Sequence, residues 1–258
     1  MGERQRFRDR VMLVTGATSG MGRACARALA GEGARVAAAG RRGERLAALA
    51  AELGAAGAQV LTLEGDVRDE ATCARWVSET VQRFSGLDGL VNAAGVIGTG
   101  GAADTATAEW DRVMDSNLRS IFLLTRAAAP ELIRRRGAVV NLSSVAGLRP
   151  YPNLLAYCVS KAAVDQYTRC AALDLAPHGV RVNAVNPGVV VTELHTVTNA
   201  VPDYAAFLEK GKTTHPLGRV GTAEEVAELV LYLLSDAAGW VTGVTWSIDG
   251  GRALSSAR

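Results

Sequence analysis

Short apolar runs alternate with longer amphipathic stretches along almost the whole chain. The short runs are unbroken series of mainly Val, Leu and Ala, which predict strands buried on both faces and hence a parallel sheet covered by helices. Residues 1–258 are therefore expected to form one doubly wound α/β domain. The seven predicted strands are Val11–Thr15, Arg35–Ala39, Gln59–Leu63, Gly89–Asn92, Ala138–Leu142, Arg181–Asn186 and Val244–Ile248. The predicted helices are about Gly22–Ala30, Glu44–Leu53, Glu70–Phe84, Ala108–Arg135, Asn153–Ala176 and Ala223–Ser235.

Composition narrows the class of protein. The chain has 258 residues, 48% of them hydrophobic and 21% charged, which suits one globular core. A net charge of +2 gives no reason to expect nucleic acid or an anionic membrane as a partner. Four scattered cysteines and three scattered histidines indicate neither a disulfide framework nor a metal site. No apolar run is long enough for a signal peptide or a membrane span, so we expect a soluble cytoplasmic protein.

The first predicted strand runs directly into a glycine-rich turn, Thr15-Gly-Ala-Thr-Ser-Gly-Met-Gly22. Glycines at 16, 20 and 22 allow a tight turn and let a phosphate approach the backbone. The helix that follows presents free N–H groups and its positive end to that phosphate. After the first strand of an alternating α/β chain, this turn predicts a dinucleotide site. A P-loop is excluded, because no Gly-Lys-Ser/Thr follows.

The end of the second predicted strand bears on which dinucleotide binds. An NAD-selective site has a carboxylate at this position, which accepts hydrogen bonds from the ribose hydroxyls and repels a 2′-phosphate. Gly40 occupies that place, and Arg41 and Arg42 follow. Arg41 comes directly after Gly40, and an arginine there can make a charge-assisted, two-pronged contact to the 2′-phosphate, so we expect NADP(H) to be preferred, with NAD(H) as the alternative. Both arginines could instead be solvated residues that open the next helix.

Other strand ends carry weaker signals. Asp66 and Val67 follow the third strand, where Asp66 could bind an adenine edge or cap the next helix. The fourth strand ends in Asn92-Ala-Ala-Gly95. Such small residues indicate that the backbone lies close to another part of the protein or to a ligand. Asn117 lies inside a long helical pattern, which disfavours it. We expect it to be an exposed polar residue, or else to mark a kink or a buried hydrogen bond.

Three polar residues near the fifth predicted strand suggest proton transfer. Ser144 follows the strand, and Tyr157 and Lys161 are four residues apart on a predicted helix, so they share one face. A phenol has a pKa of about 10. A cation at about 4 Å contributes about 4 kcal/mol at an effective dielectric near 20, enough to bring that pKa close to neutrality in a partly closed site. The pair could then exchange a proton with a substrate oxygen; a chance pair on a solvated face is the alternative.

Taken together, these motifs resemble those of the short-chain dehydrogenase/reductase family, in its compact branch without a separate substrate domain. The likeness extends from about Arg10 to Gly251 and implies a single Rossmann-type domain with a seven-stranded parallel sheet. The residues that carry it are Thr15-Gly-x3-Gly-x-Gly22, Asn92-Ala-Ala-Gly95, Asn117, Ser144, Tyr157-x3-Lys161, Asn186-Pro187-Gly188 and Asp249-Gly250-Gly251.

The resemblance implies roles for these positions. Tyr157 would be the general acid, and Lys161 would lower its pKa and bind the nicotinamide ribose. Ser144, not Ser143, would bind the substrate oxygen, and Asn117 would hold a water that links Lys161 to solvent. The implied cofactor-binding residues are Gly16, Ser19, Gly20, Met21, Gly22, Arg41, Arg42, Asp66, Val67, Asn92, Ala93, Gly95, Tyr157, Lys161, Pro187, Gly188, Val190 and Thr192.

The sequence departs from the family pattern at two places. Ala93 stands where a second Asn is commoner. Ser19 stands where some NADP-dependent members have a basic residue. The second departure weakens the expectation of NADP(H).

The irregular stretch at about 193–217 is expected to be a lid over the substrate, and its apolar residues could close an apolar pocket. The helix 162–176 is apolar around much of its circumference. Family members pair through this helix and its neighbour, and again after Trp240, so a homotetramer or dimer is implied.

We therefore expect an NADP(H)-dependent oxidoreductase, carbonyl or 3-oxoacyl reductase-like, that interconverts a ketone and a secondary alcohol. An NAD(H)-dependent dehydrogenase of a sugar, polyol or steroid-like alcohol is the alternative. A dinucleotide-binding sensor or scaffold would not need Ser144, Tyr157, Lys161 and Asn117. A methyltransferase would leave the Tyr–Lys pair unexplained.

Overall fold

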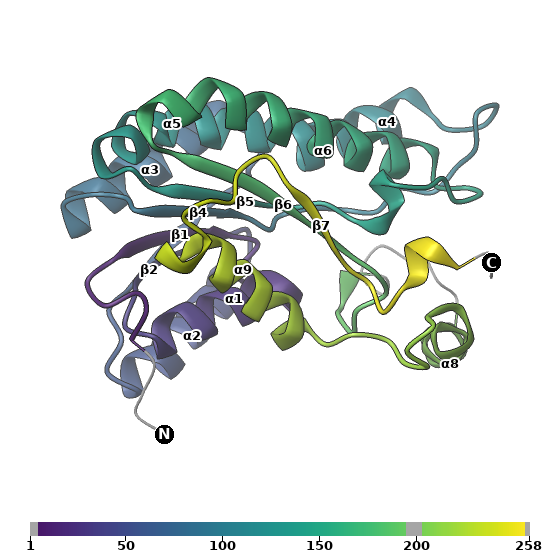
Figure 1. Ribbon diagram of the computed structural model, residues 1–258, viewed down its shortest axis with the longest axis horizontal. Helices are drawn as coiled ribbons and strands as arrows, with labels where there is room; N and C mark the ends of the chain where they lie inside the picture. Colours follow the sequence, from purple (N-terminus) through teal and green to yellow (C-terminus); the bar gives the residue numbers. More distant parts are fainter. Residues whose placement is uncertain (1–4, 195–202, 256–258) are drawn as a thin grey trace.

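Seven parallel strands form the centre of the molecule, with helices on both faces (Figure 1). The computed structural model describes residues 5–194 and 203–255. The strand order is β3-β2-β1-β4-β5-β6-β7, which confirms the predicted doubly wound parallel sheet. The strands are β1 Val11–Thr15, β2 Arg35–Gly40, β3 Val60–Glu64, β4 Gly89–Asn92, β5 Ala138–Leu142, β6 Arg181–Pro187 and β7 Thr245–Ile248.

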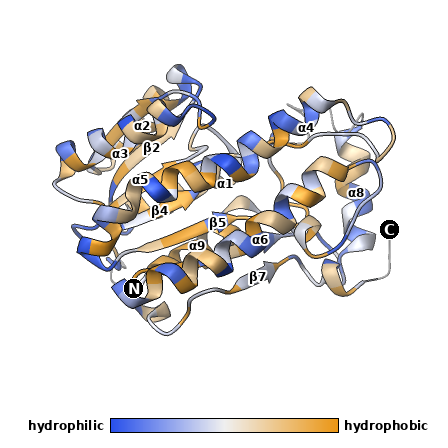
Figure 2. Cartoon of the chain, turned by 90° about the horizontal axis from the view of Figure 1, so that it is seen from above, coloured by the Kyte–Doolittle hydropathy of each residue, from blue (hydrophilic) through white to orange (hydrophobic). Residues whose placement is uncertain are grey.

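Alternate residues of each central strand supply two separate cores. Met12 and Val14 of β1 face one side of the sheet, whereas Val11 and Leu13 face the other, and all four are buried. This is why the strands read as unbroken apolar runs. Figure 2 shows apolar colour along β4 and β5 and mixed colour on the covering helices.

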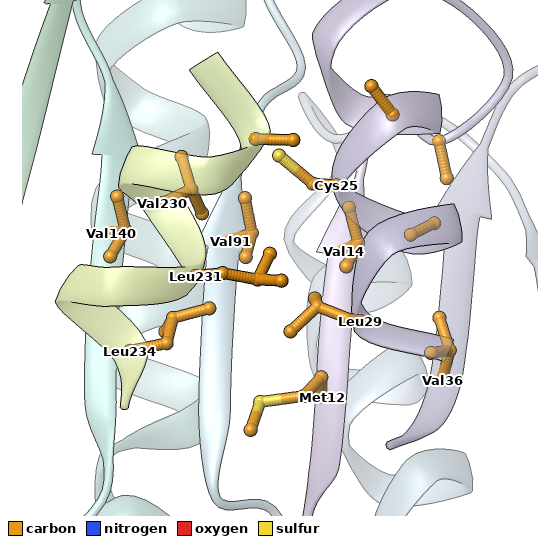
Figure 3. Packing of buried hydrophobic residues seen from close by; sticks show 14 of the residues in the cluster. Met12, Val14, Cys25, Leu29, Val36, Val91, Val140, Val230, Leu231 and Leu234 are labelled. Atoms are coloured by element: carbon orange, nitrogen blue, oxygen red, sulfur yellow. The ribbon is translucent and has the colours of Figure 1, made fainter. Parts of the chain in front are cut away.

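Helices α1 and α9 cover one face together with α2, and α3, α5 and α6 cover the other (Figure 1). Figure 3 shows Leu29 of α1 and Leu231 of α9 packed together above the sheet. The helices are α1 Gly20–Gly31, α2 Gly43–Ala55, α3 Glu70–Phe84, α4 Thr107–Met114, α5 Ser120–Arg135, α6 Leu155–Leu175, α8 Tyr204–Thr214 and α9 Ala223–Leu234.

One predicted helix is not continuous. The pattern Ala108–Arg135 is divided into α4 and α5 by a π-helical turn, Asp115–Arg119. Such turns inside α-helices often occur at functional sites. In the part of the chain that the structure describes, no helix combines the length and apolar character that crossing a bilayer would need.

The strand order reverses between β1 and β4, which lie side by side although two other strands separate them in the sequence. At such a point the loops that leave the carboxyl ends of the strands diverge and open a crevice. The glycine-rich turn after β1 and the segment Asn92–Gly95 after β4 both lie there. The fold therefore places the predicted dinucleotide site at this edge of the sheet.

Candidate active site

A groove of about 580 Å³ follows the carboxyl ends of the strands. It brings together residues from the glycine-rich turn, from the ends of β2, β3 and β4, and from α6. The predicted cofactor-binding residues that line it are Gly16, Ser19, Gly20, Met21, Gly22, Arg41, Arg42, Asp66, Val67, Ala93, Gly95, Tyr157, Lys161 and Thr192.

The glycine-rich turn has the shape that a pyrophosphate requires. Gly16 has a φ of +66°, and a Cβ there would lie 2.9 Å from the carbonyl oxygen of Ala93. A Cβ on Gly22 would overlap the carbonyl oxygen of Gly16. Helix α1 begins at Gly20, so its first N–H groups face the groove. Glycine at these two positions lets the turn pack tightly on its own backbone and on the segment after β4, and this packing leaves the start of α1 facing the groove, as a dinucleotide phosphate requires.

A second cavity, of about 350 Å³, adjoins the groove. The two spaces share wall residues Met21, Ser143, Tyr157, Thr192 and Leu194. Most of the remaining wall is apolar, with Ile97, Leu154 and Phe207 among its members. A ligand in this cavity would therefore meet both Tyr157 and whatever occupies the groove.

Four predicted cofactor residues lie outside the groove. Pro187, Gly188 and Val190 line the second cavity and not the groove. Asn92 is buried below the site, where its Nδ2 donates to Asn141 Oδ1 at 2.8 Å. Asn92 therefore joins β4 to β5 and holds the floor in place.

The two neighbouring serines have different partners. The Ser143 hydroxyl donates to the carbonyl oxygen of Lys161 at 3.1 Å, which ties β5 to α6. The Ser144 Oγ accepts from the N–H of Ala146 at 3.1 Å and so caps the short 3-10 turn Val145–Gly147. Ser144 also hydrogen bonds to the Tyr157 phenol, which lowers the pKa of that phenol. Of the two, Ser144 is the one placed to act with Tyr157.

Burial controls the protonation of the Tyr–Lys pair. Both side chains are nearly inaccessible to solvent. Burial raises the pKa of Tyr157 to about 12, against the smaller lowering effect of Ser144. Burial also lowers the pKa of Lys161 to about 8. We expected Lys161 to lower the pKa of the Tyr157 phenol toward 7, but that pKa is raised. The reason is that the desolvation of Tyr157 outweighs the effect of every charge near it. The phenol keeps its proton and can donate it.

Lys161 is directed toward the floor of the groove. Its Nζ donates to the carbonyl oxygen of Leu142 at 2.7 Å and lies 5.8 Å from the centre of the Tyr157 ring. Helix α6 carries both residues one turn apart, as predicted. The ammonium is thus held by a backbone carbonyl.

Asn117 lies in the π-helical turn and is completely buried. Its Oδ1 accepts from the N–H of Val96 at 2.8 Å, and its Nδ2 donates to Val96 O at 2.9 Å and Ser160 Oγ at 3.0 Å. The expectation of a buried hydrogen bond is confirmed, and that of an exposed polar residue is wrong. Asn117 connects the loop after β4 to α6 beside Lys161.

Known proteins share this architecture. A family model described as enoyl-(acyl carrier protein) reductase matches residues 16–253. A solved short-chain dehydrogenase/reductase from Caenorhabditis elegans superposes with a TM-score of 0.90 at 34% identity, covering 96% of this chain and 97% of the other. The chain is a short-chain dehydrogenase/reductase.

Curated relatives cover several substrates. The chain is 38% identical over 251 residues to 2-(S)-hydroxypropyl-CoM dehydrogenase 3 of Xanthobacter autotrophicus, covering 95% of this chain and 97% of that protein. It is 36% identical over 252 residues to trans-4-hydroxycyclohexanecarboxylate dehydrogenase of Sinomonas cyclohexanicum, covering 95% and 93%. It is 38% identical over 242 residues to a 3-oxoacyl-[acyl-carrier-protein] reductase of Staphylococcus aureus, covering 93% and 96%.

Membership of the family makes this protein an oxidoreductase that acts on CH–OH groups with a nicotinamide dinucleotide. The sensor, scaffold and methyltransferase alternatives are therefore wrong.

A buried acid below the site of this short-chain dehydrogenase/reductase was not predicted. Asp165 lies one turn after Lys161 on α6, and its Oδ2 accepts from Asn186 Nδ2 at 2.9 Å. Asn186 Nδ2 also lies 3.0 Å from the carbonyl oxygen of Ser144. A Cβ on Gly147 would lie 2.9 Å from the carbonyl oxygen of Lys161, so only glycine lets this turn pack on α6. The spacing of Lys161 and Asp165 was the signal available in the sequence.

The two arginines after β2 differ in their contacts. Arg42 Nη2 donates to Ser19 Oγ at 2.7 Å and Thr18 Oγ1 at 2.9 Å, and Nη1 lies 3.3 Å from a carboxylate oxygen of Glu193. Arg41 is exposed at the rim of the groove. Arg42 is therefore the arginine that is oriented toward the glycine-rich turn.

Acidic groups in the groove are held by neighbouring arginines. Asp66 binds the Arg68 guanidinium at 2.7 Å, and this contact lowers the pKa of Asp66. Helix α3 is capped by Asp69 and not by Asp66, so the capping interpretation is wrong. Glu109 and Arg112, which also line the groove, form an ion pair at 2.6 Å. Sequence reasoning missed them, because an acid and an arginine three residues apart are common on solvated helices.

Proposed function

We propose that this enzyme interconverts a small ketone and its secondary alcohol with NADP(H), and that Tyr157 is the general acid and base. One observation carries the proposal: the hydroxyl-bearing side chains of Tyr157 and Ser144 line a mostly apolar cavity that adjoins the dinucleotide groove. A carbonyl oxygen bound between their hydroxyls would place its carbon toward the groove.

When bound, the nicotinamide ring supplies or accepts the hydride. In reduction a C–H bond forms at the carbonyl carbon while Tyr157 gives its proton to the oxygen, which becomes the alcohol hydroxyl. The raised pKa of Tyr157 suits this direction, because the phenol is fully protonated at neutral pH. Ser144 stabilises the oxygen as negative charge develops on it. In oxidation each transfer runs in reverse.

Lys161 and Asn117 would support this chemistry. The Lys161 ammonium lies on the groove wall near Gly95, where it can bind the ribose hydroxyls of the cofactor and stabilise a phenolate after proton transfer. Asn117 would position Lys161 through Ser160 and would help a water return the proton from solvent.

The preference for NADP(H) is supported by Arg42. A guanidinium beside Ser19, at the start of α1, can donate charge-assisted hydrogen bonds to a 2′-phosphate. Gly40 provides no carboxylate to bind the two ribose hydroxyls, and Thr18 Cγ2 would lie 2.8 Å from any Cβ at this position. The NAD(H)-dependent alternative lacks a comparable observation.

The substrate is proposed to be a small molecule under a lid at 193–217. Residues 195–202 of this lid lie outside the described residues. Of the described part, Phe207 and Leu194 line the cavity, and the Tyr204 hydroxyl lies 3.0 Å from Thr192 O. The apolar wall supports a carbonyl or 3-oxoacyl reductase-like activity over one on a sugar or polyol, whose many hydroxyls would lose hydrogen bonds there.

A homotetramer, or at least a dimer, is proposed from two exposed apolar surfaces. On α6, Leu173 is 77% exposed, and Phe122 on neighbouring α5 is 43% exposed. Trp240 is fully exposed, and Trp246 of β7 is 44% exposed. Side chains of this size are usually covered in an assembly. A monomeric mass by light scattering at micromolar concentration would contradict this proposal.

We also propose that the enzyme is located in the cytoplasm.

A spectrophotometric scan tests the function directly. Purified enzyme is mixed with ketones and aldehydes of increasing size, once with NADPH and once with NADH, and cofactor oxidation is followed. We expect turnover of at least one ketone, faster with NADPH. Faster turnover with NADH would contradict the cofactor preference, and no turnover of any carbonyl compound or alcohol would contradict the function.

A further inference from the structure

The cavity next to Tyr157 has one charged side chain among its described wall residues, that of Arg252. No Asp or Glu lines this cavity within residues 5–194 and 203–255. Arg252 comes from the 3-10 turn Arg252–Leu254 near the carboxyl terminus, far in sequence from Ser144 and Tyr157. Figure 1 shows this yellow turn beside α8 at one edge of the molecule.

The local fold fixes the position of Arg252. Asp249 accepts from the N–H of Gly251 at 3.0 Å and of Ala253 at 2.7 Å, so it holds the turn from both sides of Arg252. The Arg252 Nε donates to the Tyr151 hydroxyl at 3.2 Å, and Nη1 donates to Thr214 Oγ1. Tyr151 also lines the cavity, and its ring lies 5.3 Å from the guanidinium carbon. These contacts therefore fix the orientation of the Arg252 side chain.

The charge of Arg252 has no counterion in the described molecule. Its hydrogen bonds to Tyr151 and Thr214 are to neutral hydroxyls, it forms no ion pair with a described carboxylate, and its Nη2 binds no described residue. Arg42, by contrast, lies 3.3 Å from Glu193. The Arg252 charge is one of the causes that lower the pKa of buried His215 nearby.

Arg252 is half-buried, so water solvates part of its charge, and an oxyanion in the cavity can pair with it at close range. The Arg252 Nη2, which has no described partner, can donate to a carboxylate or a similar oxyanion in a charge-assisted hydrogen bond. We propose that the substrate is a keto acid or hydroxy acid, whose oxyanion binds Arg252 while its carbonyl or hydroxyl carbon lies at Ser144 and Tyr157. This inference rests on the proposed function and adds the substrate class to it.

The competing role for Arg252 is that of a brace, joining the carboxyl-terminal turn to Tyr151 and Thr214. The two roles predict different kinetics. A brace affects every substrate alike, whereas an anion-binding residue affects only substrates that carry the anion. Arg149 serves as the control for bracing, because its Nη1 donates to the carbonyl oxygen of Arg252 at 3.1 Å and its guanidinium carbon lies 5.7 Å from the centre of the Tyr151 ring, but it does not line the cavity.

The experiment compares straight-chain keto acids, beginning with levulinate, with their uncharged primary amides. Each pair has nearly the same shape, so the ratio of kcat/KM for acid over amide isolates the charge. The enzymes are wild type, Arg252→Gln, Arg252→Lys and Arg149→Gln, each with saturating NADPH. Keto sulfonates of the same lengths form a further arm that separates carboxylate from sulfonate recognition.

For wild type we expect at least one acid to exceed its amide by about tenfold or more, as one hydrogen-bonded charge contact provides. Arg252→Gln should bring that ratio to about one while changing kcat/KM for the amide less than about threefold. Arg252→Lys should retain part of the preference, because the charge remains. Arg149→Gln should retain most of it.

Several outcomes would overturn the inference. Wild type could favour the amides, or Arg252→Gln could keep the acid preference. Arg252→Gln could also slow acid and amide equally, which would show a brace. If neutral ketones are reduced but acids are not favoured, only this inference fails; if no carbonyl compound is reduced, the proposed function fails. Calorimetric titration of the keto acids into the enzyme saturated with NADP⁺, which has no hydride to transfer, tests the inference without turnover, since binding should weaken about tenfold in Arg252→Gln.

Discussion

The dinucleotide groove and the adjoining cavity share Tyr157 but are built differently. Most of the groove is formed by turns that follow strands β1 to β4, each within a few residues of its strand, and α4, α6 and residues 192–194 also line it. The cavity combines Ile97, Ser144, Phe207 and Arg252, which come from four distant segments. Hydride chemistry thus depends on local motifs, whereas substrate choice depends on tertiary packing.

A buried polar network supports α6, the helix that carries Tyr157, and borders the groove at Lys161. Asn117, Ser160 and Lys161 are buried, and hydrogen bonds join Asn117 to Ser160 and Lys161 to Leu142. Every such bond is costly to leave unmade in a buried site. Changes to this network should therefore act on Tyr157 through α6 and so affect both spaces, and changes to one wall should affect one space.

The largest effect is expected at Tyr157, the residue common to both spaces. Tyr157→Phe keeps the ring and removes the proton donor. Activity should fall by at least about 10²-fold, the low end for losing a general acid. Binding of NADPH, measured by fluorescence titration, should be nearly unchanged. Turnover near the wild-type rate would show that Tyr157 is not the acid.

A smaller effect is expected at Arg42, which belongs to the groove alone. Arg42→Ala should lower the ratio of kcat/KM for NADPH over NADH by about 10- to 100-fold, because a charge-assisted contact to the 2′-phosphate is lost. The order of preference among ketones should stay the same. Arg41→Ala is the matched control and should change the ratio less, since Arg41 has no contact with the glycine-rich turn. An unchanged ratio in Arg42→Ala would remove the reason for expecting NADP(H).

Phe207 tests the cavity alone. Phe207→Ala removes an aromatic wall residue and should lower kcat/KM for apolar ketones by about tenfold, as expected for lost apolar contact with the substrate. The KM for NADPH should not change. Leu208→Ala, on the same helix but not in the cavity wall, provides the control. If the KM for NADPH rose as much as that for ketone, groove and cavity would not be separable.

The smallest effect concerns His215, which holds the base of α8 against the loop after β6. Its Nε2 accepts from the N–H of Val189 at 3.1 Å, and Nδ1 lies 2.6 Å from the carbonyl oxygen of Gly211, so the ring is neutral with its proton on Nδ1. Burial lowers the pKa of His215. The unfolded chain therefore binds a proton below about pH 6.5 that the folded protein resists.

Stability from His215 is thus complete above about pH 6.5 and falls as the pH decreases below it, by at most about 1.4 kcal/mol per pH unit. Urea unfolding at several pH values should show this loss in wild type and a smaller one in His215→Gln. His178→Gln, at an exposed histidine, should behave as wild type. Equal pH dependence in all three proteins would contradict the assignment.

The sequence predicted the groove far better than the cavity. Glycines 16 and 22, Tyr157 and Lys161 follow spacing rules of one turn or one helix, so the fold, the groove and the Tyr–Lys pair could be found from sequence. Arg252 could not, because nothing near it in the chain indicates a cavity. The raised pKa of Tyr157 was also missed, since desolvation depends on residues that only the fold brings around the phenol.

The most direct measurement follows the hydride. Enzyme is incubated with a ketone from the scan and NADPH deuterated at the transferable position, and the alcohol is examined by mass spectrometry and proton NMR. We predict one deuterium, on the carbinol carbon, and its absence from that carbon with unlabelled NADPH in heavy water. An alcohol without deuterium from labelled NADPH, or oxidation of NADPH without alcohol, would contradict the proposed reaction.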